Sequence, residues 1–180
     1  MKEAHQFPAI SRLIHWLMAV MIIAMLFIGV GMVASTGRYA ELVSIHRPLG
    51  IAILALVVVR VVNRVINRPP PLPASLPAVQ RIAAKASHHL LYALMFAMPL
   101  IGWAMVSAAG EPVRLAGPLV LPPIVPAEPG LYAGLRTAHG LLAYLFFAVI
   151  LVHLGAALFH GLVRRDGVLE SMASVTTDRR

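Results

Sequence analysis

The chain has 180 residues and contains no cysteine. This absence excludes a disulfide scaffold, thiolate zinc sites, iron–sulfur clusters on protein thiolates, covalently attached c-type haem and a cysteine nucleophile. Charged residues are also scarce, at 12% of the chain, whereas hydrophobic residues make up 59%. Soluble domains average about 25% charged and about 45–50% apolar residues. A water-soluble fold of this size cannot bury so much apolar surface, so the composition predicts an integral membrane protein.

Motifs of hydrolases and nucleotide-binding proteins are missing as well. The sequence has no Ser/His/Asp grouping, no paired carboxylates and no glycine-rich phosphate loop. It contains eight histidines instead, and all of them except His5 lie in or beside long apolar segments. The chemistry of this protein is therefore expected to depend on histidine.

Four apolar segments are long enough to cross a membrane, which takes about 20 mostly apolar residues. The second contains Arg47 and Arg60, whose side chains must extend toward the two membrane surfaces if the helix is to span. We predict an all-α integral membrane protein, an antiparallel up-down-up-down four-helix transmembrane bundle that forms one domain over residues 1–180. The predicted spans are about residues 13–35, 44–66, 86–108 and 137–163, followed by a cytoplasmic tail at 164–180.

The positions of lysine and arginine predict the orientation of the bundle. These residues concentrate in the N-terminal segment, in the connection between the second and third spans and in the C-terminal tail. Cytoplasmic segments carry the excess of positive charge, so both termini are expected on the cytoplasmic side of the membrane. The same bias explains the net charge of +8 without a nucleic-acid partner. The few arginines on the periplasmic side are Arg38, Arg47, Arg114 and Arg136.

The connections between spans are expected to be short or ordered. Residues 68–73 are rich in proline, and Ser75 is expected to cap a helix that begins near Pro77. The periplasmic stretch Gly110–Gly134 is rich in proline and glycine and is expected to form an ordered loop or lid.

Four histidines pair by their depth in the membrane. His139 and His153 are 14 residues apart on one predicted span, a separation of about 21 Å that returns to nearly the same helix face. Because the fourth span runs inward, His153 lies at the depth of His15, and His139 lies at the depth of His46. An ionisable residue inside a membrane is costly unless it is paired or coordinated. The pattern therefore indicates two transverse histidine pairs, one in each leaflet.

Two opposed imidazoles at one depth suit a b-type haem held between the helices of a bundle. Bis-histidine ligation leaves no open coordination position, which favours electron transfer over oxygen chemistry. Zinc and copper are weaker alternatives because neither depth offers a third ligand, and hydrogen bonding between helices is the plain structural alternative. The small residues expected to let a porphyrin approach the backbone are Gly29, Gly31, Gly50, Gly140 and Gly155.

Three further histidines lie near the cytoplasmic depth. His88 stands four residues before Tyr92 and is expected to be a quinone contact or an alternative iron ligand, unless it only meets the lipid headgroups. His89 shares these alternatives. His160 follows His153 by two helical turns and is expected to be solvated or interfacial.

Arginines are candidate partners for haem propionates. Arg60 lies closest to the hydrocarbon and either neutralises a propionate or extends to the membrane surface. Arg47 and Arg136 are candidates for the same role at the periplasmic haem.

Several short motifs occur in order along the chain. They are Ser11–Trp16 (SRLIHW), Ile45–Ile51 (IHRPLGI), Val57–Arg60 (VVVR), Ser87–Tyr92 (SHHLLY), Pro99–Gly102 (PLIG), and the pair His139 and His153. Through these motifs the chain resembles, over roughly residues 8–172, the bacterial cytochrome b561 family, which is related to the cytochrome b subunits of formate dehydrogenases and nickel–iron hydrogenases. The resemblance implies a four-helix membrane bundle that holds two non-covalent b haems and exchanges electrons with quinone.

The resemblance also implies a ligand set by position. His15 and His153 are expected to bind the cytoplasmic haem, and His46 and His139 the periplasmic haem. The related dehydrogenase subunits carry an added helix and docking segments, so a subunit role is the weaker expectation for this chain.

The expected function is that of a di-haem cytochrome b561-type electron carrier, an oxidoreductase between a periplasmic-side donor and membrane quinone. The donor is unidentified, with superoxide, quinol, a soluble reductant and a partner dehydrogenase as alternatives, and the quinone is ubiquinone or menaquinone. Two other functions stay open: a membrane anchor and haem conduit of a larger dehydrogenase, and a histidine-based proton or metal transporter. The expected partners are membrane lipid, quinone and the donor, with a homodimer or a dehydrogenase partner as further alternatives.

Overall fold

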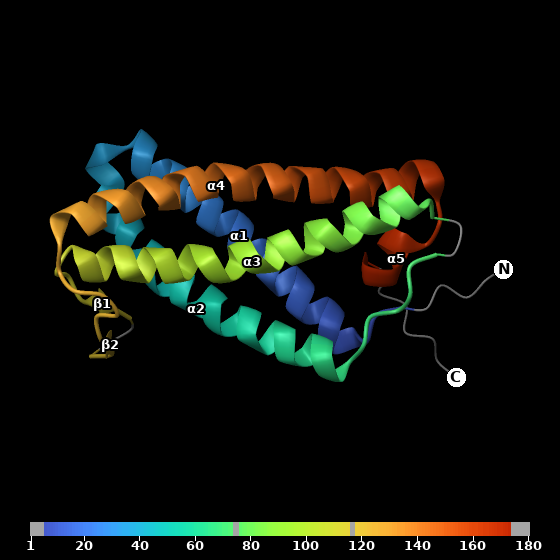
Figure 1. Cartoon of the computed structure of the whole chain (residues 1–180), viewed down its shortest axis with the longest axis horizontal. Coiled ribbons are helices and arrows are strands. Elements are labelled where there is room, and N and C mark those ends of the chain that lie inside the picture. The colour runs from blue at the N-terminus through green and yellow to red at the C-terminus, as the bar shows by residue number, and fades with distance from the viewer. Residues whose placement is uncertain (1–5, 74–75, 116–117, 174–180) are drawn as a thin grey trace.

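The computed structural model describes residues 6–73, 76–115 and 118–173. Its four long helices are antiparallel in sequence order and form one bundle, as Figure 1 shows. All four are long and apolar enough to cross a membrane, which agrees with the predicted all-α transmembrane bundle. They are α1 (Ala9–Ala34), α2 (Tyr39–Ile66), α3 (Ala78–Ala108) and α4 (Pro129–Leu158).

Shorter elements connect and follow these helices. They are the 3-10 turn η1 (Thr36–Arg38), the strands β1 (Val113–Arg114) and β2 (Val120–Leu121), the π-helix η2 (Phe159–Arg164) and the helix α5 (Val168–Ala173). The strands lie at one end of the bundle and α5 lies at the other (Figure 1). We call these the hairpin end and the α5 end. The amide of Phe7 donates to the carbonyl of Ser171 at 3.0 Å, so the first and last described segments meet at the α5 end.

Every helix begins before the span predicted from apolar residues alone. The largest differences are at α3, which begins at Ala78, and at α4, which begins at Pro129. The Glu128 side chain accepts from the amides of Gly130 and Leu131 and so caps α4, with proline in the favoured first position. Capping and proline therefore start α4 within the stretch that was expected to be loop. Helix α3 does begin beside Pro77, but the predicted cap Ser75 lies outside the described residues.

The helices pack mainly against their neighbours in the sequence. Helix α1 lies along α2, α2 along α3, and α3 along α4, whereas neither α1 nor α2 packs extensively on α4 over the described residues. The two helices of each predicted histidine pair, α1 with α4 and α2 with α4, are therefore not tightly packed partners. A group bound between the paired histidines would therefore lie between two helices that do not pack directly on each other.

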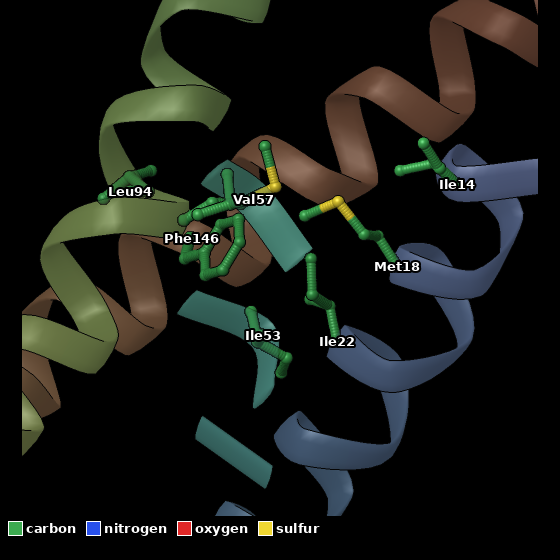
Figure 2. Packing of buried hydrophobic residues seen from close by; sticks show 8 residues of the cluster. Ile14, Met18, Ile22, Ile53, Val57, Leu94 and Phe146 are labelled. Atoms are coloured by element: carbon green, nitrogen blue, oxygen red, sulfur yellow. The ribbon is translucent and has the colours of Figure 1, made fainter. Parts of the chain in front are cut away.

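The buried core lies in the middle of the bundle, and Figure 2 shows its side chains converging from all four helices. Phe146 is only 6% exposed and stands seven residues from both His139 and His153. The core is built from apolar side chains, so a dry layer separates the two histidine levels. Its members are Ile14, Met18, Ile22, Ile53, Val57, Leu94, Met95 and Phe146.

The loop at the hairpin end is ordered around the end of α3. The hydroxyl of Ser107, a buried side chain, donates to the Trp103 carbonyl at 2.9 Å and accepts from the Ile124 amide at 3.2 Å. The Trp103 indole donates to the Pro122 carbonyl at 3.0 Å. Strands β1 and β2 pair antiparallel, with Val113 opposite Leu121. The described part of this stretch is thus an ordered loop, except that its last residues belong to α4.

Candidate functional site

The first histidine pair lies toward the hairpin end and joins α2 to α4. The ring centroids of His46 and His139 are 6.2 Å apart and their planes are inclined by 68°. The Nδ1 atoms of both rings are buried without a hydrogen-bond partner. A buried polar atom without a partner is costly, and such atoms in a native protein call for a ligand, an ion or water.

Glycines face both rings of this pair. A Cβ atom at Gly29 would lie 3.9 Å from His46 Cε1, and one at Gly102 would lie 3.4 Å from His139 Cε1. Gly29 was among the glycines expected beside a porphyrin. Gly102, on α3, was not recognised from the sequence, although it lies in the motif Pro99–Gly102, because nothing in the sequence shows which face of α3 meets α4.

The other expected glycines have different surroundings. The Cβ position of Gly50 faces Met25, and that of Gly31 faces Leu42. No non-local atom of the described chain lies within 4 Å of the Cβ positions of Gly140 and Gly155.

The second pair lies toward the α5 end and joins α1 to α4. The ring centroids of His15 and His153 are 6.4 Å apart and their planes are inclined by 69°. His88 on α3 also contacts this pair, with its ring centroid 5.5 Å from that of His153. The structure thus brings together His15, His88 and His153, three of the histidines expected near the cytoplasmic depth, and it separates them from His46 and His139 by the apolar core.

The spacing of the rings can be compared with metal ligation. An imidazole nitrogen binds a metal at about 2 Å, and its ring centre lies about 1.2 Å further on, so two imidazoles on opposite faces of one ion have centroids about 6.4 Å apart. The pairs His46–His139 and His15–His153 both match this spacing. The 5.5 Å between His88 and His153 is shorter than this ligation spacing, although all three ring pairs lie edge-to-face.

Arg60 joins the second pair to Tyr92. Its Nη2 atom lies 2.9 Å from His15 Nδ1, and its Nε donates to the Tyr92 hydroxyl at 3.1 Å. A guanidinium group only donates, so Nδ1 of His15 accepts this hydrogen bond. The third nitrogen, Nη1, is buried and has no partner. Arg60 therefore carries a positive charge and an unused buried donor beside the histidines, which is a suitable environment for an anionic oxygen.

The remaining sequence candidates have protein partners. His89 is exposed and its Nδ1 lies 2.8 Å from the Lys85 carbonyl of its own helix. Arg47 pairs with Glu111 at 2.8 Å, and Arg136 donates to the Tyr132 hydroxyl at 3.2 Å. Each of these three side chains is therefore already bonded to another group of the protein.

His160, which was expected to be solvated or interfacial, has a protein partner. Its side chain is only 16% exposed, and Nδ1 lies 2.7 Å from Asp166 Oδ2. The sequence does not reveal this contact, because the chain turns between the two residues through Arg165 in a left-handed conformation with φ of 49°.

Comparisons with known proteins agree with this architecture. The family model described as "Prokaryotic cytochrome b561" matches residues 6–174. Cytochrome b561 homolog 2 of Escherichia coli (strain K12) is 33% identical over 171 residues, 93% of this chain and 90% of the relative. The probable superoxide oxidase CybB of Yersinia pestis is 33% identical over 160 residues, 88% of this chain and 90% of the relative. Cytochrome b561 homolog 1 of the same E. coli strain is 32% identical over 93 residues, 52% of each chain.

The four membrane-capable helices and these matches define a membrane cytochrome b, an electron carrier that binds b-type haem. The chain belongs to the prokaryotic cytochrome b561 family, as its motifs predicted, and it is a bacterial membrane protein.

Proposed function

We propose that the protein binds two b haems, one held by His15 and His153 and the other by His46 and His139. The observation that carries this proposal is the spacing of the two ring pairs, 6.4 and 6.2 Å, at opposite ends of one apolar core. Both pairs share α4, where a 14-residue separation puts the second ring nearly on the face of the first. When bound, each haem supplies reversible one-electron transfer, and the protein supplies its ligands, position and electrostatics.

Arg60 is proposed to bind a propionate of the haem at the α5 end. A neutral imidazole that binds a metal through Nε2 carries its proton on Nδ1. Ligation by His15 through Nε2 therefore requires Arg60 to release Nδ1, where it now donates at 2.9 Å. The released Nη2 and the unpartnered Nη1 then have a carboxylate as their natural acceptor.

His88 is proposed to be a quinone contact rather than an iron ligand. Its ring lies 5.5 Å from that of His153, which is too short for two ligands on opposite faces of one iron. It is close enough to the pair to hold a quinone oxygen within electron-transfer reach. Tyr92 is nearby, but its hydroxyl accepts from Arg60 and its ring lies under the guanidinium groups of Arg60 and Arg64, so His88 is the stronger candidate.

The bundle is proposed to sit in the inner membrane with the α5 end in the cytoplasm. The positive-inside bias supports this orientation, and the contact between Phe7 and Ser171 supports a common side for both termini. The hairpin end then faces the periplasm, where the electron donor binds, and ubiquinone or menaquinone reacts at the cytoplasmic end.

Superoxide is the proposed donor, because one relative that matches nearly the whole chain is named a probable superoxide oxidase. Oxidation of two superoxide anions to O₂ releases two electrons, which with two protons reduce one quinone to the quinol. A pocket of about 430 Å³ at the hairpin end is lined by Arg47, Arg114 and Glu111; because Glu111 pairs with Arg47, Arg114 supplies the charge that would attract an anion there. Quinol is the second candidate donor.

The other two functions predict different behaviour of the purified protein. An anchor subunit would contain the same haems but would not turn over alone. A histidine-based metal or proton transporter would be colourless. Within the described residues no group of three or more His, Asp or Glu side chains is arranged to hold a metal ion.

The test is superoxide-driven quinone reduction by the purified holoprotein in proteoliposomes. Superoxide is generated enzymatically on the outer side, and quinol formation and haem reduction are followed optically. We expect quinol to form in proportion to superoxide consumed, and we expect His46→Ala to abolish it. Reduction of the haems by quinol but not by superoxide would instead identify quinol as the donor.

A further inference from the structure

The chain reverses direction sharply after α4. It passes through the π-helix η2 and the left-handed residue Arg165, and Gly167 also has a positive φ of 83°. Helix α5 then packs beside the C-terminal end of α4, as Figure 1 shows. We call residues 159–173 the C-terminal hook. π-Helical turns are rare and often occur near functional sites.

Polar contacts hold the hook in its bent form. Asp166 is the centre of these contacts: Oδ2 lies 2.7 Å from His160 Nδ1 and 3.5 Å from Arg164 Nε. Its other oxygen accepts from the Val168 amide at 3.3 Å and so caps α5. Both carboxylate oxygens are used, which fixes the turn between α4 and α5.

Close apolar packing adds to this turn. A Cβ atom at Gly161 would overlap the Leu169 side chain, so a larger residue at this position would force Leu169 to shift. Within the hook, α5 is therefore packed against η2.

The hook reaches the start of α1 through two hydrogen bonds. The Trp16 indole Nε1 donates to the Met172 carbonyl at 3.1 Å, and the Phe7 amide donates to the Ser171 carbonyl at 3.0 Å. Trp16 also contacts the neighbouring His15 ring edge-to-face, with centroids 5.4 Å apart. A continuous path therefore runs from the end of α4 through the hook and Trp16 to His15.

This path connects two helices that do not otherwise pack extensively on each other. Helices α1 and α4 carry His15 and His153, whose rings must stay at one fixed separation if both bind one iron. The His46–His139 pair lies at the opposite end, where the loop between α3 and α4 contacts α2 through the Arg47–Glu111 ion pair and α3 through Trp103 and Ser107.

We propose that the C-terminal hook fixes the separation of α1 and α4 at the His15–His153 haem, and that Trp16 is a positioning residue that orients the His15 ring. This inference rests on the proposed ligand role of His15 and His153. In this proposal the C-terminal hook controls how tightly one of the two haems is retained and how its two ligands are oriented. Loosening the hook therefore affects that haem and leaves the His46–His139 haem unchanged.

The test compares haem loss from the two sites of the detergent-solubilised holoprotein. Excess apomyoglobin serves as the haem acceptor, and His153→Ala and His139→Ala supply the reference spectra of the single haems. Trp16→Phe keeps an aromatic side chain but removes the indole N–H donor together with the five-membered part of the ring system, and the lost hydrogen bond alone corresponds to about fivefold in an equilibrium. We expect about fivefold faster loss from the His15–His153 site and a shift in the low-spin electron paramagnetic resonance signal of that haem, which reports the angle between its imidazole planes.

A second variant, Leu169→Asp, removes the apolar packing of the hook, and we expect more than tenfold faster loss from the same site. Glu170→Gln is the matched control, because this side chain lies on α5 but is exposed. Equal acceleration at both sites, or no change in Trp16→Phe, would overturn the inference. If His15→Ala and His153→Ala themselves leave both haems in place, the ligand assignment is wrong instead, so the two failures are distinguishable.

Discussion

Arg60 Nη2 lies 2.9 Å from His15 Nδ1, inside the bundle and beside a proposed iron ligand. Arg60 contacts both His15 and Tyr92, and its Nη1 atom is a buried donor without a partner. The Arg60 guanidinium therefore lies as a positive charge beside the haem that we propose at His15 and His153. The effect of this charge on the midpoint potential of the haem can be measured separately from haem binding.

A positive charge stabilises the reduced haem, so Arg60→Gln should lower the midpoint potential of the His15–His153 haem. A change of about 60 mV, tenfold in the equilibrium constant of a one-electron couple, is the expected scale. Arg60→Lys should retain most of the potential. Potentiometric titration of both haems gives the result, and equal shifts at the two haems would argue against a local role.

Ligand substitutions should act in pairs. His46→Ala and His139→Ala are each expected to remove the same haem, and His15→Ala and His153→Ala the other, because partners share one iron. Redox difference spectra of the four variants identify which component is lost. If His88→Ala removed a haem that His15→Ala spares, the assignment at the α5 end would be wrong.

His88→Ala should keep both haems and slow electron exchange with quinone. The ring lies against His153 at a spacing suited to contact and not to shared ligation. The measurement is stopped-flow oxidation of the reduced haems by a water-soluble ubiquinone analogue at equal haem content. His89→Ala is the control, since that ring lies exposed against its own helix, and rates unchanged in His88→Ala would place the quinone elsewhere.

Phe146→Ala should destabilise the bundle by about 3–5 kcal/mol, because it leaves a cavity where all four helices meet. The adjacent Phe147 is 48% exposed within the described chain and lies outside the core, so Phe147→Ala should cost far less. Thermal unfolding of the two variants in the same detergent compares them. Equal losses of stability would show that Phe146 has no special place in the core.

The sequence was sufficient to predict the four-helix bundle and which histidine rings meet across it. Charge-free apolar segments define the spans, and the 14-residue separation of His139 and His153 fixes two levels on α4 whatever the details of packing. The contacts of the rings across the bundle follow from these levels once the helices alternate in direction. For this reason the structure brings His15 to His153 and His46 to His139.

Other features depend on backbone geometry that residue type does not encode. The hook requires a left-handed Arg165, a conformation that arginine rarely adopts, and a π-helical turn before it. Neither has a signature in the sequence, so His160 was expected to meet solvent or the interface and not Asp166. Gly102 was missed for a related reason, since its role depends on the rotation of α3 against α4.

The most direct test of the central claim is the haem content of the purified protein by pyridine haemochrome, referred to its protein concentration by amino-acid analysis. We expect two b haems for each chain, and we expect acid acetone to extract both, because the sequence has no cysteine to hold them covalently. One haem for each chain, or none, in a folded preparation would contradict it.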